Sequence, residues 1–335
     1  MFLADLIAGN IPDLVDLSET DVYLALKNRG LLENLNDYLE RDGELSKDDF
    51  IEQSLEFYGE KGKVYGIPYA LILHAMMGDA TYLGDRKAWT LEEFRDFLDD
   101  LPDPQMVTKA LTKQEMLREL VKQYWGCFID QEGHRCNFQS KEFREILELS
   151  SVFSEEDGED ENLEEALITW NQVKNGELIL MADFFSGAGE NYVTRSTMFP
   201  GKGRLIGFPT AQGNGISLTH NGLAVAMISS GQHKEEAWEF IKYEMTHEKP
   251  GFDYLQFTSY QPLFEKKRKE QLEASDQLEA GAMRDLLENG TVISAQEEVI
   301  LELIAEEAEG YFHGAKTAQQ IAEILEGRIG LYLTE

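Results

Sequence analysis

The chain has 335 residues, of which 42% are hydrophobic, and its 63 acidic and 30 basic side chains give a formal net charge of −33. This length predicts two compact units or one large two-lobed domain, with enough apolar side chains to fill real cores. The negative charge argues against a general nucleic-acid partner and against an anionic membrane face, because both would repel the protein.

Five segments carry helix signals along the chain. Thr90 begins a capping box, and apolar side chains recur behind it at helical spacing. We expect further helices around 117–124, after Ser140, around 237–245 and after Thr317, because each segment has an apolar stripe on one face.

Short apolar runs bordered by Gly, Pro or Asn lie between these helices. They predict strands at 14–17, 178–181, 205–208 and 222–228. Strands that alternate with helices indicate an α/β fold. The acidic run 154–162 is expected to be a solvated loop, because it lacks the glycine and glutamate positions of an EF-hand calcium loop.

The two cysteines, Cys127 and Cys136, lie on either side of a Glu132-Gly133 pair that is typical of a hairpin turn. A disulfide across this hairpin and two free thiols are both compatible with the sequence. There is no Cys-x-x-Cys pair, so the sequence predicts no zinc site of that type, and we expect no metal and no cofactor.

The start of the chain has neither the basic residues nor the apolar segment of a signal peptide. No stretch approaches the roughly 18 uncharged apolar residues that a membrane-spanning helix needs. These features predict a cytosolic protein or a fragment whose export signal lies upstream.

Seven segments form a pattern whose order spans nearly the whole chain. They read Gly-Asn-Ile-Pro-Asp-Leu-Val-Asp-Leu at 9–17, Gly-Lys-Val-Tyr-Gly-Ile-Pro-Tyr at 62–69, Trp-Thr-Leu-Glu-Glu-Phe at 89–94, Asn-Gly-Glu-Leu-Ile-Leu-Met at 175–181, Gly-Phe-Pro-Thr-Ala-Gln-Gly at 207–213, a Lys-x-x-Ala-Trp-x-Phe-Ile helix within 231–247, and Tyr-Phe-His-Gly-Ala-Lys-Thr at 311–317. In this order they resemble the sugar-type, maltose-binding-protein-like extracellular solute-binding proteins (family 1) of bacterial ABC importers.

Two features depart from that family. Its usual first strand and helix, with the lipoprotein signal, have no counterpart at the front of the sequence. Residues 71–79 also lack the Tyr-Asn pair that often follows the first crossover strand, and read instead through His74-Ala75-Met76-Met77-Gly78-Asp79.

The resemblance implies an α/β protein of the two-lobed periplasmic-binding-protein type (type II), with a ligand cleft between the lobes. Lobe 1 would comprise 1–68 plus 211–290, and lobe 2 would comprise 69–210 plus 291–335. It implies a protein that lies outside the cell, is lipid-anchored in its full-length form and is typically monomeric. Such a protein is no enzyme, and it delivers a carbohydrate to the membrane permease of an ABC importer.

Aromatic rings stack on the apolar faces of sugars, and polar side chains bind the hydroxyl rim. By resemblance, the stacking candidates are Trp125, Phe184 and Phe185, with Tyr69 as a further candidate. Phe184 and Phe185 are neighbours at a strand end, so one of them should point into the core. Trp125 suits the core and the cleft equally well, since large aromatic residues are usually buried.

The candidates for hydrogen bonding are Asp183, Glu190, Asn191, Asn214 and Ser18. Asp183 follows a strand, where α/β sites lie, but it could also cap a helix. Glu190 and Asn191 follow a glycine-rich loop and could be plain surface. Asn214 could simply shape a turn, and Ser18 could cap the segment after the first strand.

Two other classes of protein remain open. A glycan-active enzyme needs two carboxylates, and Asp183 and Glu190 could serve, although the sequence has no His-Glu-x-x-His, Gly-x-Ser-x-Gly or phosphate-loop motif. A surface protein that binds a partner and no longer transports would have an absent or filled cleft. Sugar-induced stabilisation and sugar hydrolysis would separate the three classes.

Overall fold

The computed structural model describes residues 12–17, 19–103, 106–107, 111–154, 163–248, 256–271 and 283–334, apart from the side chains of 163–166, 189–192, 221–223 and 270–271. Within these residues the chain is a mixture of helices and strands, which confirms the predicted α/β class.

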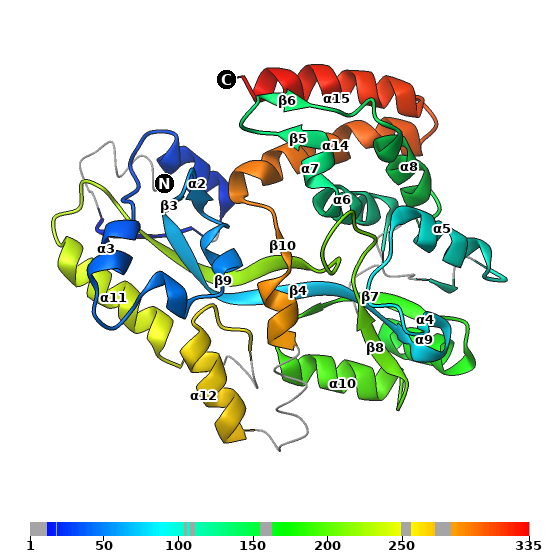
Figure 1. Cartoon of the computed structure of the whole chain (residues 1–335), viewed down its shortest axis with the longest axis horizontal. Coiled ribbons are helices and arrows are strands. Elements are labelled where there is room, and N and C mark those ends of the chain that lie inside the picture. Colours follow the sequence, from blue (N-terminus) through cyan, green and yellow to red (C-terminus); the bar gives the residue numbers. More distant parts are fainter. Residues whose placement is uncertain are drawn as a thin grey trace.

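A six-stranded sheet runs through the middle of the molecule (Figure 1). Its order is β1-β9-β4-β7, with β10 beside β9 and β8 beside β4. The first part of β4 pairs with β9 and its last part pairs with β7 and β8, so this one strand connects both ends of the sheet. The strands are β1 (Leu14–Asp16), β4 (Gly66–Asp79), β7 (Leu180–Phe185), β8 (Gly203–Ile206), β9 (Ser217–Met227) and β10 (Thr291–Val292).

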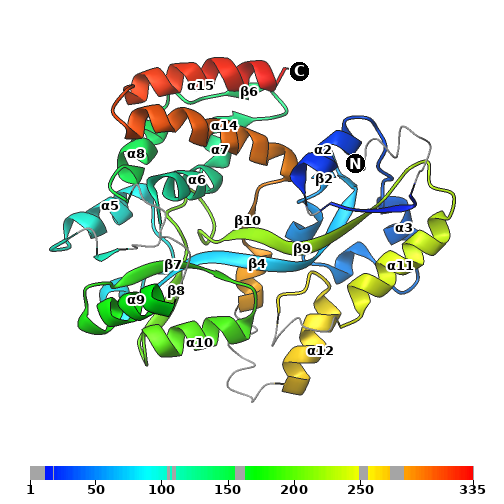
Figure 2. The ribbon, with the colours of Figure 1, turned by 180° about the vertical axis from the view of Figure 1, so that it is seen from behind.

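Helices surround the sheet at both of its ends (Figures 1 and 2). They are α2 (Thr20–Lys27), α3 (Asn36–Arg41), α4 (Ala80–Leu83), α5 (Leu91–Asp99), α6 (Lys113–Gln123), α7 (Trp125–Phe128), α8 (Lys141–Ser150), α9 (Leu163–Asn175), α10 (Ala188–Met198), α11 (Lys234–Thr246), α12 (Gln261–Gln271), α14 (Ala295–Phe312) and α15 (Ala318–Tyr332). The described residues also include a helical stretch at 283–288, two 3-10 turns, Lys47–Asp49 and Glu52–Leu55, and two short hairpins, Gly59–Glu60 with Lys63–Val64 and Ile129–Asp130 with Arg135–Cys136.

The helices form two groups on opposite sides of the molecule. In Figure 1, α3, α11 and α12 lie on the left, and α5, α6, α8, α14 and α15 lie on the right. Each group has its own apolar core: Trp238 and Ile241 of α11 lie in the left one, and Leu120 of α6 and Ile304 of α14 in the right one. A third core lies against one face of the sheet and joins the two sides. Buried apolar surface therefore stabilises both parts and the strands between them.

The predicted helices are confirmed, because their signals act within a few residues. The Thr90 and Thr317 capping boxes form, and the Ser140 hydroxyl accepts the backbone N–H of Phe143. The apolar stripe predicted around 237–245 lies on α11, where Ala237, Trp238, Ile241 and Met245 are buried. The acidic run 154–162 lies outside the described residues, apart from its first residue.

The strands are confirmed as elements, but their ends differ from the predictions. The run predicted at 178–181 becomes β7, which begins two residues later and extends to Phe185. The run at 205–208 becomes β8, which begins at Gly203 and ends at Ile206, and the run at 222–228 becomes the longer β9. Pairing with β4 fixes these ends, and that pairing cannot be read from local hydrophobicity.

The cysteine hairpin forms, but no disulfide closes it. Its strands pair Ile129 with Cys136, so the residue facing Cys136 is not a cysteine. Cys127 lies earlier, in the short helix α7, and both thiols are free. The prediction left both states open, and the hairpin register decides for free thiols.

Candidate functional site

A row of four side chains crosses the sheet from strand to strand. Phe184 of β7 pairs with His74 of β4, His74 pairs with Ser217 of β9, and Ser217 pairs with Thr291 of β10. Residues paired in this way point to the same face of a sheet. On β4 the neighbouring residues Leu73 and Ala75 face the core on the other side, so the row lies on the opposite face.

Helix α6 lies over this row and contacts three of its members. Nδ1 of His74 is 3.1 Å from Oε1 of Glu119. One turn later, Gln123 donates from Nε2 to the Ser217 hydroxyl at 2.9 Å, and its Oε1 accepts from the Thr291 hydroxyl at 3.2 Å. Side chains four residues apart share one face of a helix. Glu119 and Gln123 thereby connect α6 to β4, β9 and β10.

Glu119 is a buried carboxylate. Both Glu119 and His74 are only 4% exposed. Burial by itself raises the pKa of Glu119. The charge of Lys122, whose Nζ is 2.8 Å from Oε1, and the contact with His74 both lower this pKa, and their combined effect is larger than that of burial. The net pKa therefore lies well below the usual value. The carboxylate is therefore ionised at neutral pH. Its second oxygen, Oε2, has no hydrogen-bond partner among the described residues.

Phe184 ends the row at the surface, with 52% of the residue exposed. One face of its ring stacks on the His74 ring, with centroids 3.9 Å apart and planes inclined by 12°. The Phe208 ring also contacts the His74 ring, with centroids 4.8 Å apart and planes inclined by 60°. An exposed aromatic ring supported from below presents a flat apolar surface, and polar groups lie one layer deeper.

The structure separates the four predicted stacking residues. Phe184 is exposed and Phe185 is fully buried, as expected for neighbours on a strand. Tyr69 is also buried, and its hydroxyl donates to the His247 carbonyl at 3.3 Å, so its ring packs in the left-hand core. Trp125 begins α7 and is partly buried against the right-hand core.

The predicted polar residues do not form one cluster. Asp183 is partly buried, and its Oδ1 accepts the backbone N–H of Phe184 at 2.8 Å. Asn214 shapes a turn, because its side chain accepts from Ile216 N–H and donates to the Leu286 carbonyl. The side chains of Glu190 and Asn191 lie outside the described residues, although α10 contains both positions, and Ser18 lies outside them altogether.

Five residues of the row and its covering helix were not predicted: His74, Ser217, Thr291, Glu119 and Gln123. His74 stood out only as a departure from the family pattern. Glu119 and Gln123 are polar positions on a helix whose apolar stripe was recognised, and a polar residue on a helix is ordinarily solvated. Ser217 has no local signal, because its role comes from pairing with His74.

A second polar contact lies on the other face of the sheet. The Tyr58 hydroxyl donates to the Leu17 carbonyl at 2.6 Å, and it is 2.9 Å from Nε2 of His220. Because that hydroxyl proton is already used, Nε2 of His220 donates to the Tyr58 oxygen. Burial lowers the pKa of His220 to about 4, so this imidazole is neutral at pH 7.

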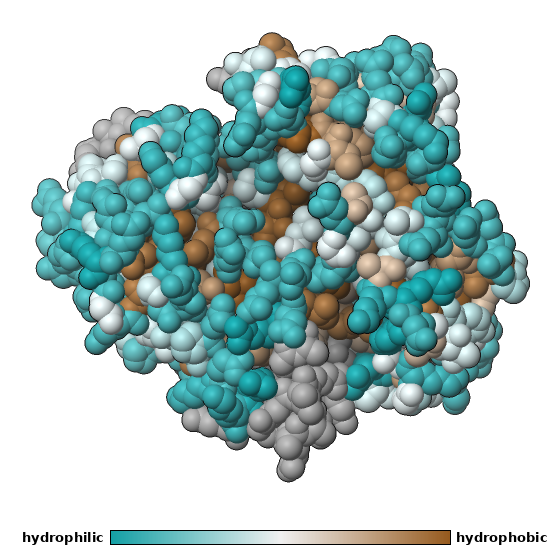
Figure 3. All heavy atoms as spheres, in the orientation of Figure 1, coloured by the Kyte–Doolittle hydropathy of each residue, from teal (hydrophilic) through white to brown (hydrophobic). Residues whose placement is uncertain are grey.

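The described part of the chain contains no group of three or more His, Cys, Asp or Glu side chains that could hold a metal ion. Among the same residues, no helix is both long enough and apolar enough to cross a bilayer. Figure 3 shows a hollow near the middle of the surface, where apolar side chains lie between the left and right parts of the molecule.

The sequence matches the model of a family described as bacterial extracellular solute-binding protein, over residues 2–134. Among curated proteins compared by sequence, none matches this chain. The fold is similar to many solved structures. One is the sugar-binding protein MalE from Xanthomonas citri, which has 17% identity and a TM-score of 0.72, with 99% of this chain and 86% of that chain covered.

Two further solved structures illustrate the range of similar folds. The periplasmic oligogalacturonide binding protein from Yersinia enterocolitica has 15% identity and a TM-score of 0.68, covering 99% of this chain and 87% of that one. An ABC transporter solute-binding protein from Agrobacterium radiobacter, in complex with ribitol, has 17% identity and a TM-score of 0.61, covering 98% and 87%.

These likenesses define a two-lobed periplasmic-binding-protein fold, so the predicted fold class is confirmed. The predicted resemblance to extracellular solute-binding proteins is confirmed by the family match over residues 2–134, and the neighbours that are named as sugar-binding or oligogalacturonide binding proteins share the fold. This family and its structural neighbours are binding proteins of transport systems rather than enzymes.

Proposed function

We propose that the chain binds a carbohydrate in the cleft between two lobes and delivers it to the membrane permease of an ABC importer. The lobes comprise 1–68 with 211–290, and 69–210 with 291–335. In this proposal the protein is a monomer held at the cell surface by a lipid anchor, and it catalyses no reaction on its solute.

The observation that carries this proposal is the exposed Phe184 ring, which has its back supported by His74 and polar groups of α6 beneath it. A pyranose has an apolar C–H face that suits such a ring and hydroxyls that suit the surrounding polar atoms. The names of the structural neighbours, which refer to sugars, oligogalacturonide and ribitol, are consistent with this chemistry.

Two of the three cores support the lobe boundaries, and the third contains residues of both proposed lobes. All members of the right-hand core fall within 69–210 and 291–335. The left-hand core falls within 12–70 and 225–263, so it passes the proposed boundary at 68 by two residues. The strands β4 and β9 run between the two parts, and a change of angle between the lobes would bend these strands.

Charge favours a neutral solute over an acidic one. The protein carries a net charge of −33, and an ionised carboxylate, Glu119, lies beneath the exposed ring. A uronate would approach against this potential, whereas a neutral sugar or polyol would not.

Among the predicted residues, Phe184, Trp125 and Asp183 are the ones we place nearest the solute. Glu190, Asn191 and Ser18 remain predictions, and the buried Tyr69 and Phe185 and the turn residue Asn214 would support the site from outside it.

A thermal-shift and calorimetric screen tests the proposal, using maltose, longer gluco-oligosaccharides, ribitol and oligogalacturonides, with amino acids as controls. A solute present at 100 times its Kd stabilises the native state by about 2.7 kcal/mol, which raises Tm by a few degrees. Phe184→Ala should weaken binding of the active solute at least about fivefold, because one stacking contact is lost.

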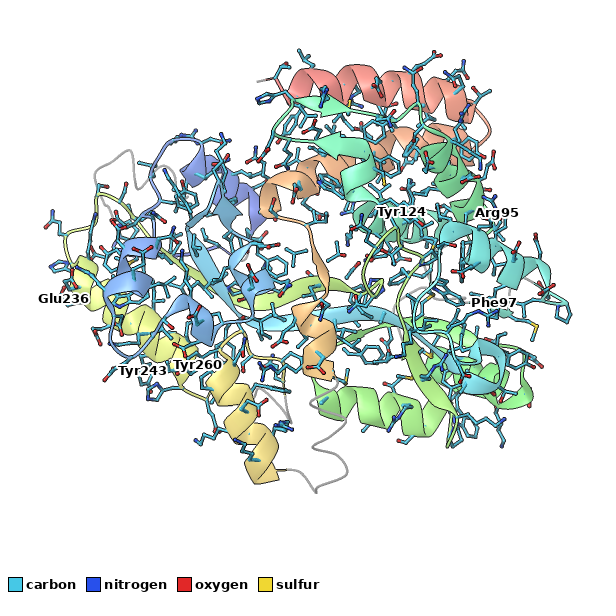
Figure 4. The ribbon with its side chains drawn as sticks, in the orientation of Figure 1. Arg95, Phe97, Tyr124, Glu236, Tyr243 and Tyr260 are labelled. Carbon is cyan, nitrogen blue, oxygen red and sulfur yellow. The ribbon has the colours of Figure 1, made fainter. Side chains whose placement is uncertain are left out.

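Phe240→Ala is the matched control. Phe240 is also an exposed phenylalanine, with 47% of the residue accessible, but it belongs to α11. Figure 4 shows Tyr243 of α11 on the side of the molecule opposite Tyr124, the residue that directly follows α6. If Phe184→Ala and Phe240→Ala lose the same affinity for the solute, Phe184 is not part of the binding site. If no sugar or polyol binds the folded protein, the carbohydrate proposal is wrong. If the protein hydrolyses any tested sugar, it is an enzyme and the proposed binding function is wrong.

A further inference from the structure

The exposed Phe184 ring lies nearly parallel to the imidazole beneath it. More than half of the residue is accessible, and its ring stacks on His74. A phenylalanine side chain at such a position is free to change rotamer unless a neighbour holds it. The orientation of Phe184 therefore depends on whether the His74 ring keeps a fixed plane.

The His74 ring is contacted by two further side chains besides Phe184. Nδ1 contacts Oε1 of Glu119 at 3.1 Å, and Phe208 packs against the ring at 60°. The backbone of His74 is fixed as well, because β4 pairs at this residue with β7 on one side and β9 on the other. Rotation about the His74 side-chain bonds is the remaining freedom, and the contact with Glu119 restricts it.

Glu119 is suited to hold the imidazole because its carboxylate cannot turn toward water. It is buried, and Lys122 contacts the same oxygen that faces His74, at 2.8 Å. The Oε1 atom therefore lies within 3.1 Å of both Nδ1 of His74 and Nζ of Lys122, and the contact with His74 is a close approach without hydrogen-bond alignment. A buried side chain that already makes two such contacts loses little further entropy when the ring above it is ordered.

We propose that Glu119 is a positioning residue: through His74, it fixes the plane of the Phe184 ring and so prepares the stacking surface before any solute arrives. This inference rests on the proposed carbohydrate function, which supplies the solute. Affinity increases when a binding surface is already ordered, since ordering a side chain on binding opposes association. Glu119 would act on affinity without touching the solute.

The first test observes the ring itself, in the absence of solute. The full chain is prepared with 4-fluorophenylalanine at position 184, and its 19F shift and linewidth are recorded. His74→Leu removes the stack and gives the reference signal of an unsupported ring. Glu119→Leu keeps the side-chain volume and lets Lys122 extend to water, and we expect its signal to move at least half of the way to the His74→Leu value.

Gln123→Leu is the matched control for this test. Gln123 lies one turn from Glu119 on the same helix and contacts Ser217 and Thr291 rather than His74. Its 19F signal should remain at the wild-type position. A Glu119→Leu protein that is folded by circular dichroism and keeps the wild-type signal overturns the inference. If Glu119→Leu does not fold, Glu119→Gln is judged by the same criterion.

The second test measures the consequence for binding. For the sugar that binds the wild type, we expect Glu119→Leu to raise Kd about three- to tenfold. A moved 19F signal with an unchanged Kd would overturn the positioning role, because an ordered ring would then not matter for the solute. If the wild type binds no sugar, the proposed function fails, and the 19F result alone decides whether Glu119 fixes the ring.

Discussion

Lys122→Met removes the cation that faces the buried carboxylate of Glu119 and keeps a side chain of similar length. Nζ of Lys122 lies 2.8 Å from Oε1, and the Glu119 side chain is only 5% exposed. The carboxylate would then keep its burial and lose the nearest positive charge. Removing one partner of a buried ion pair typically destabilises a protein by about 3–5 kcal/mol.

Three features place the expected loss within that range. Oε2 of Glu119 already lacks a hydrogen-bond partner among the described residues, so the carboxylate has little other stabilisation. The contact with His74 remains in the variant and limits the loss. Lys122 itself is partly exposed, so its own desolvation is small. We therefore expect a loss of about 3 kcal/mol at neutral pH.

The loss should depend on pH, with a sign set by Glu119. In the wild type its pKa lies below the ordinary value of 4.5, so the stabilisation is present above pH 4.5 and disappears as the pH falls toward the native pKa. In Lys122→Met burial dominates and raises the pKa, so the carboxyl takes up a proton while still buried. The difference between the two proteins should therefore shrink between pH 7.5 and pH 5.

Urea unfolding followed by tryptophan fluorescence measures this difference at both pH values. Lys141→Met is the matched control, because Lys141 pairs with Glu145 at 2.8 Å on the surface of α8 and is 77% exposed. Such surface pairs contribute about 0.3–0.5 kcal/mol. The reasoning is refuted if Lys122→Met loses no more stability than Lys141→Met, or if its loss is the same at pH 7.5 and pH 5.

Three further outcomes are expected. Thr317→Ala should lower the free energy of unfolding by about 1 kcal/mol in urea, because the Thr317 hydroxyl caps the N-terminus of α15. Thr317→Ser keeps a hydroxyl and should retain most of the wild-type stability. The pKa of Asp42 is about 2, because the Trp238 indole N–H and other donors outweigh its burial; Asp42→Asn should therefore lose about 1–3 kcal/mol at pH 7 and distinctly less at pH 3. Native protein titrated with Ellman's reagent should show two thiols, with the exposed Cys127 reacting before Cys136; a protein with no thiols would contradict the hairpin register.

The helices and their caps could be predicted from the sequence, because the groups that determine them lie within one or two turns. The Thr90 and Thr317 boxes and the buried stripe of α11 needed only local spacing. The family resemblance came from the order of short segments along the chain, and it anticipated the fold class. For the site, it indicated the aromatic pair at 184–185, whose alternation on a strand separates an exposed ring from a buried one.

The ends of the strands and the polar row required the tertiary structure. His74, Phe184, Ser217 and Thr291 are scattered over more than two hundred residues, and only the pairing of four strands brings them into one line. Glu119 carries no local sign of its role, because a carboxylate on a helix is ordinarily solvated, and only the packing of α6 on the sheet buries it beside His74. Local spacing therefore determined the elements and the class of protein, whereas the register between distant strands determined which side chains meet, because hydrogen bonds between strands join residues that are remote along the chain.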